Sequence, residues 1–110
     1  MSETDLESLV AQAREMQSRL ADLQRDLAQR RVESSAGGGM VTAVASGELR
    51  ILEVRIEPSL LTGGDRQMIQ DLTAAAVNAA LTKAQKMIQE EIQQASGGLS
   101  VSLPFVTGGG

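Results

Sequence analysis

The first third of the chain shows a regular alternation of apolar and polar positions. Apolar side chains recur at intervals of three and four residues over three heptads, which places them on one face of a helix. Thr4 and Glu7 have the spacing of a capping box, and the next position on the stripe, Arg30, is polar. The pattern predicts a helix over about 5–31, with an apolar stripe of Leu6, Leu9, Ala13, Met16, Leu20, Leu23 and Leu27.

The next segment has the pattern of a three-stranded antiparallel meander. A short β-prone stretch precedes three glycines at 37–39, which allow a sharp reversal into small and β-branched residues at 40–46. Ser-Gly-Glu at 46–48 predicts a hairpin turn. In the third strand the apolar parity changes near Ile51, which predicts a bulge there, and Pro58 ends the strand.

A second long helical pattern fills most of the remainder. We expect a loop over 59–64 and a helix from Asp65, whose carboxylate can cap it, to about residue 95. Small residues over 74–80 would let the two long helices pack side by side. Residues 1–95 are therefore predicted to form one α+β domain of order α-β-β-β-α, with two long helices flanking the sheet, followed by a flexible Gly- and Ser-rich tail over 96–110.

The composition predicts association of this small domain with itself. Of the 110 residues, 42% are hydrophobic, but 14 are alanine and Phe105 is the single aromatic residue. Aromatic side chains supply much of the buried area in small domains, so the core of one copy is thin. We expect an oligomer. The polar N-terminus and the absence of an apolar run long enough to span a bilayer predict a soluble, cytoplasmic protein with no membrane partner.

Catalysis and metal chemistry have little support in the sequence. The chain has no His, Cys or Tyr, so it lacks the usual side chains that titrate near neutrality or act as nucleophiles. We therefore expect no enzyme activity, no small-molecule substrate, no cofactor and no metal. The adjacent carboxylates of Glu90 and Glu91 diverge on a helix, and the glycines at 37–39 lack the lysine of a phosphate-binding loop.

Four short strings, in this order and spacing, resemble the YbaB/EbfC family of bacterial nucleoid-associated proteins. They are Ala-Arg-Glu-Met-Gln at 13–17, Ala-Gly-Gly-Gly-Met-Val at 36–41, Glu-Pro-Ser-Leu-Leu at 57–61 and Ala-Val-Asn-Ala-Ala at 76–80. The resemblance covers nearly the whole chain. It implies a tweezers-like homodimer formed through the sheets, with helical arms that bind DNA in the nucleoid. The implied dimer interface comprises Val41, Val44, Leu52, Val54 and Ile56.

The candidate DNA contacts are basic residues on the two long helices. The net charge of −4 restricts any DNA contact to a local surface. Five arginines fall within eighteen positions. Spacings of three or four residues predict intrahelical ion pairs, in which a phosphate would have to replace the carboxylate: Glu15–Arg19, Asp22–Arg25, Asp26–Arg30 and Lys86–Glu90. The candidate set is Arg14, Arg19, Arg25, Arg30, Arg31, Lys83 and Lys86.

Two functions of different kinds remain open. The first is a homodimer that binds duplex DNA with little sequence preference and affects chromosome organisation or transcription. The second is a protein-interaction module of the same fold, in which the helical arms or the apolar cluster at 103–105 bind another protein, as the acidic net charge favours. The scarcity of aromatic residues argues against recognition of single strands by base stacking.

Overall fold

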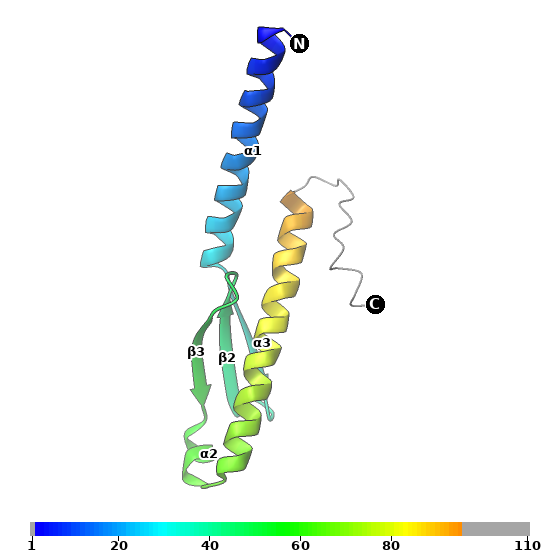
Figure 1. The fold of residues 1–110 in the computed structure, drawn as a ribbon. Coiled ribbons are helices and arrows are strands. Elements are labelled where there is room, and N and C mark those ends of the chain that lie inside the picture. Colours follow the sequence, from blue (N-terminus) through cyan, green and yellow to red (C-terminus); the bar gives the residue numbers. More distant parts are fainter. Residues whose placement is uncertain (1, 96–110) are drawn as a thin grey trace.

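The computed structural model describes residues 2–95 and has the predicted order of elements (Figure 1). The α+β arrangement of helix, three-stranded antiparallel sheet and helix is confirmed. The predicted flexible tail at 96–110 lies outside the described residues. The elements are α1 (Glu3–Gln29), β1 (Arg31–Ala36), β2 (Val41–Ser46), β3 (Ile51–Ile56), α2 (Pro58–Thr62) and α3 (Arg66–Ala95).

Both ends of α1 differ from the prediction by a few residues. The Ser2 hydroxyl accepts a hydrogen bond from the backbone N–H of Asp5 (3.3 Å), so Ser2 is the cap and the capping box at Thr4 was wrong. The helix ends at Gln29 because Arg31 already pairs with β2 as the first residue of β1. Backbone pairing across the sheet therefore replaces the last predicted turn of the helix.

The predicted loop after β3 contains a short helix instead. Pro58 occupies its start, where a missing N–H costs nothing, and the N–H of Gly63 closes it by donating to the carbonyl of Ser59 (3.1 Å). Leu60 is 7% exposed and packs into the core. The burial of this one leucine explains why the segment is ordered as helix α2.

The sheet has the order β1-β2-β3, with both pairs antiparallel. The glycines at 37–39 all have positive φ values, between 65° and 95°, as the predicted reversal requires. Between β2 and β3 the register passes from Val44 opposite Glu53 to Ala45 opposite Ile51, which leaves Leu52 as the extra residue. The bulge predicted near Ile51 is confirmed.

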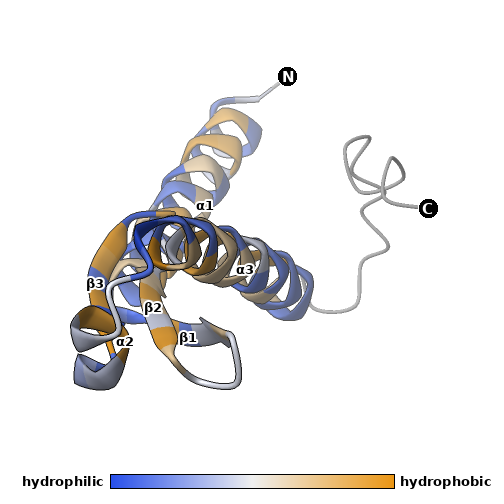
Figure 2. Ribbon diagram, turned by 90° about the horizontal axis from the view of Figure 1, so that it is seen from below, coloured by the Kyte–Doolittle hydropathy of each residue, from blue (hydrophilic) through white to orange (hydrophobic). Residues whose placement is uncertain are grey.

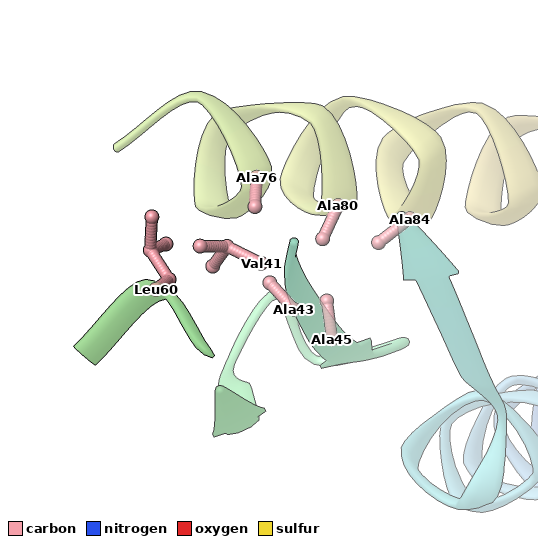
Figure 3. Packing of buried hydrophobic residues seen from close by; sticks show 7 residues of the cluster. All are labelled: Val41, Ala43, Ala45, Leu60, Ala76, Ala80 and Ala84. Atoms are coloured by element: carbon pink, nitrogen blue, oxygen red, sulfur yellow. The ribbon is translucent and has the colours of Figure 1, made fainter. Parts of the chain in front are cut away.

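The core lies between one face of the sheet and α3 (Figure 3). Alanines on α3 allow its backbone to approach the sheet closely, where they meet small and β-branched residues of β2. The prediction that these small residues pack the two long helices together was wrong: α3 lies on the sheet, and only the end of α1 contacts α3. The buried cluster comprises Val41, Ala43, Ala45, Leu60, Ala76, Ala80 and Ala84.

Replacement of Ala80 by leucine should therefore force α3 away from the sheet. Ala80 is fully buried, and added volume in a packed core costs about 1–3 kcal/mol. We expect the free energy of unfolding, measured in urea, to fall by about that amount. Ala75→Leu is the matched control, since Ala75 lies on the exposed side of the same helix. Equal stability of the two variants would contradict the placement of α3.

Helix α1 projects beyond the sheet as an arm (Figure 1). Its 27 residues extend about 40 Å, and the described part of the chain measures 74 × 28 × 17 Å. Its apolar stripe is largely uncovered: Leu6, Leu9, Met16 and Leu20 are 50–60% exposed. At the arm root, Leu27 is buried and the N–H of Gly47 donates to the carbonyl of Arg30 (3.1 Å).

Candidate nucleic-acid interface

The candidate cations occupy three parts of the structure. Arg14, Arg19 and Arg25 lie along the arm, Arg30 and Arg31 lie at its root, and Lys83 and Lys86 lie on α3. At 3.6 residues per turn, Arg14 and Arg25 lie on the same side of α1, while Arg19 is rotated by about 140° from Arg14. The seven cations therefore follow the arm and α3, and they do not form one compact cluster.

Ion pairs occupy several of these arginines. As predicted, Arg19 pairs with Glu15 (2.7 Å) and Arg25 pairs with Asp22. All four side chains of these pairs are more than half exposed, and such pairs contribute only about 0–1 kcal/mol. A phosphate oxygen can replace either carboxylate at small cost.

Arg30 forms a contact between distant parts of the chain. Its guanidinium donates to the Glu91 carboxylate (2.7 Å), which joins the arm root to α3, so the predicted pair with Asp26 was wrong. The extended backbone of Arg30, just past the helix end, turns its side chain out of the i, i+4 relation with Asp26. Arg30 is therefore a link between α1 and α3 as well as a candidate phosphate contact.

The two lysines lie beside the outer edge of β1. Lys83 Nζ donates to the backbone carbonyl of Glu33 (2.9 Å), so it occupies an edge acceptor that another strand would need. Both lysines line a shallow hollow together with Val32 and Met87. Within residues 2–95, Lys86 makes no ion pair. The intrahelical pair of Lys86 with Glu90 that the spacing suggested is therefore absent from this structure.

The distribution of charge along the arm is uneven. Helix α1 carries six acidic residues and three arginines, so the helix as a whole is acidic. Three of the acids, Glu3, Asp5 and Glu7, lie at the free tip, before the first arginine at Arg14. From Arg14 to the end of the helix the three arginines are balanced by three acids, so this half of the arm is neutral and only the tip is strongly acidic.

The sequence analysis did not select three arginines as candidates: Arg50, Arg55 and Arg66. Arg50 and Arg55 lie outside the two long helices, and Arg66 is the first residue of α3. Arg55 pairs with Glu53 and with Glu33 (2.8 Å), across the sheet face that α3 leaves uncovered. The hydrogen bond to Glu53 and the charge of Glu33 hold the pKa of Arg55 above its usual value, so this guanidinium stays charged. Arg50 and Arg66 are exposed and make no ion pair within the described part of the chain.

The residues expected at the dimer interface fall into two groups. Val41 is fully buried beneath α3, and Val44 is 3% exposed, so neither side chain lies on the surface of one copy. Leu52 and Val54 on β3 are 48% and 38% exposed, and Ile56 is half-buried. Within the expected set, the exposed apolar side chains are thus those of β3, a strand whose residues are mostly hydrophobic (Figure 2).

The surface offers shallow hollows for contact. Those along the arm are each lined by neighbouring residues of α1 alone, such as Gln12, Glu15, Met16 and Arg19. Within residues 2–95 no group of three carboxylates is gathered closely enough to hold a metal ion. None of the described helices has the length and apolar character needed to cross a bilayer.

The structure has a long arm that carries exposed arginines and is joined to a small sheet. Residues 1–99 match the model of the YbaB/EbfC DNA-binding family, and the chain belongs to this family. The family comprises DNA-binding, nucleoid-associated proteins and is not a class of enzymes. The resemblance inferred from the four strings is thereby confirmed.

Relatives from several bacteria align with most of the chain. A nucleoid-associated protein of Acetivibrio thermocellus is 45% identical over 95 residues, which are 86% of this chain and 84% of that protein. One from Desulfotalea psychrophila is 39% identical over 103 residues, or 94% of this chain and 95% of that protein. The crystal structure of an uncharacterized Helicobacter pylori protein has the same fold, with a TM-score of 0.69, 22% identity and coverage of 88% of this chain and 99% of that one.

Proposed function

We propose that this protein binds duplex DNA as a homodimer with low sequence specificity and contributes to chromosome organisation or transcription in the bacterial nucleoid. Membership of a DNA-binding, nucleoid-associated family supports the DNA partner and the location. The protein then acts in the cytoplasm, on the chromosome. DNA is the ligand, and no small molecule is needed.

The main structural support for this proposal is helix α1, the arm. Helix α1 stands clear of the sheet, and its arginines are exposed to solvent on a rod about 40 Å long (Figure 1). Exposed guanidinium groups recognise phosphates through their planar donors. The acidic tip keeps DNA away from the first turns and favours contact along residues 14–31.

Low sequence specificity follows from the same residues. Contacts to phosphates fix position and supply affinity, but they do not read base edges. Bases of single strands are usually held by aromatic side chains, and Phe105 is the single aromatic residue of the chain. We therefore expect affinity that depends strongly on salt and weakly on sequence.

The two edges of the sheet support a homodimer formed at β3. At β1 the Lys83 ammonium blocks a backbone carbonyl, whereas β3 carries the exposed side chains of Leu52 and Val54. Leu61 on α2 and Met68 on α3 add exposed apolar surface, 57% and 43% respectively. Pairing of two copies at β3 would cover apolar surface that a thin alanine-rich core leaves to solvent, and would present two arms.

The test is a titration of labelled duplex DNA between about 50 and 200 mM salt, with the mass of the protein determined in parallel. We expect binding by a dimer, with the logarithm of the association constant falling linearly with the logarithm of the salt concentration. In an Arg30→Ala/Arg31→Ala variant the slope should fall by about 1 for each phosphate that the protein no longer neutralises. A folded dimer that fails to bind even at low salt would refute DNA binding.

The uncovered stripe of α1 favours a second candidate function. Exposed leucines and Met16, beside the acidic tip, form an amphipathic surface of the kind that enters an apolar groove with a basic rim. In this alternative the arm binds another protein. The titration separates the two functions, because only the first requires affinity for DNA that decreases with salt.

A further inference from the structure

The end of the sheet next to the arm root brings two arginines from distant parts of the chain together. Arg31 begins β1 and lies opposite Ser46, the last residue of β2. On the other side of Ser46, the Arg50 carbonyl accepts a hydrogen bond from the Ser46 N–H (2.9 Å). With strands about 4.8 Å apart, the backbones of Arg31 and Arg50 are about 10 Å apart.

Both guanidinium groups are available. Arg31 and Arg50 are exposed, and within residues 2–95 neither forms an ion pair, whereas Arg30 and Arg55 beside them are paired with carboxylates. Glu48 lies in the same hairpin turn, but its carboxylate forms no ion pair with either arginine. Two arginines without an ion pair therefore lie at this end of the sheet.

The backbone that holds these arginines is fixed relative to the arm. Ser46 is 2% exposed, and its hydroxyl accepts a hydrogen bond from the N–H of Glu48 (3.2 Å). The carbonyl of Arg30 accepts from Gly47, and Leu27 is buried against the hairpin. Figure 1 shows the hairpin tip beside the lower end of α1. Little backbone freedom remains to be lost when a ligand binds.

We propose that Arg31 and Arg50 form a phosphate-binding pair that extends the DNA-contacting surface of the arm onto the end of the sheet. Each guanidinium offers planar donors to phosphate oxygens, and their spacing lets them contact one phosphate or neighbouring phosphates of one strand. The inference rests on the proposed function and assigns Arg50 to it. DNA lying along α1 passes the arm root, where these two side chains meet it.

The experiment compares Arg50→Ala with Arg66→Ala in the full chain. Arg66 is also exposed and unpaired within the described residues, but it begins α3 at the opposite end of the sheet (Figure 1). For a labelled duplex, we expect Arg50→Ala to weaken binding about fivefold at low salt and to lower the salt slope by about 1 for each copy of Arg50 that contacts the DNA. Arg66→Ala should change the dissociation constant less than twofold.

Thermal melts and mass measurements of both variants identify any change of fold or assembly. A third variant, Arg50→Lys, keeps the positive charge but lacks the planar set of guanidinium donors. Intermediate affinity of Arg50→Lys supports phosphate contact by this side chain. Equal affinity of Arg50→Ala and Arg66→Ala, with the unaltered protein binding normally, overturns the pair but leaves DNA binding by the arm intact. Absence of binding by the unaltered protein overturns both.

Discussion

Replacing Gly47 by alanine should displace the arm and destabilise the protein. A Cβ atom at this position would lie 2.0 Å from the backbone oxygen of Leu27 and 2.6 Å from its carbonyl carbon. Backbone atoms cannot move aside as a flexible side chain can, so the hairpin and the arm root must separate. We expect the free energy of unfolding in urea to fall by about 1–3 kcal/mol, the range for overpacked sites.

Gly63→Ala is the matched control for this substitution. Gly63 has a φ of −71°, and its added Cβ would lie 3.4 Å from the carbonyl oxygen of Ser59, which is an ordinary contact. This variant should keep the stability of the unaltered protein or gain slightly, because alanine restricts the unfolded chain. A Gly47→Ala protein as stable as Gly63→Ala would contradict the close packing of the hairpin against the arm root.

Two glutamates on β3 should convert the proposed dimer into monomers and weaken DNA binding. Leu52→Glu with Val54→Glu places negative charges on the apolar edge. Pairing of two copies there would bury these charges or bring like charges face to face. We expect the mass in solution to fall to the 11.6 kDa of one chain. A monomer has one arm and loses the avidity that two arms joined in a dimer provide, so its affinity for duplex DNA should be at least about tenfold lower.

A pair of glutamates on the arm is the control for the interface. Leu6 and Leu9 are as exposed as the β3 residues, but they lie on α1. If two copies meet at β3, Leu6→Glu with Leu9→Glu leaves the dimer intact. If this arm variant becomes monomeric while the β3 variant stays dimeric, the copies associate through the arms and the proposed interface is wrong.

The local features of the fold were accessible from the sequence. The three glycines at 37–39 predicted the reversal because glycine readily adopts the positive φ values that the turn requires. The change of apolar parity near Ile51 predicted the bulge. Ser2 and Thr4 are both good caps, so composition alone could not choose between them. Helix α2 has five residues, which is too short for any periodicity, and it is ordered by the burial of Leu60.

The long-range features required the structure. Ala76, Ala80 and Ala84 allow close approach by either a helix or a sheet, so the sequence did not reveal that α1 stands apart. The ion pairs of the arm were predictable because their partners are three or four residues apart. The pair of Arg30 with Glu91 spans 61 residues, and the proximity of Arg31 to Arg50 depends on strand register.

The most direct measurement is arginine side-chain NMR during titration with duplex DNA, since each guanidinium Nε–H reports on its own position. The DNA-binding account predicts that the signals of Arg14, Arg25, Arg31 and Arg50 shift or broaden, while those of Arg55 and Arg66 remain unchanged. Signals that all remain unchanged, or changes confined to Arg55 and Arg66, would contradict binding along the arm and its root.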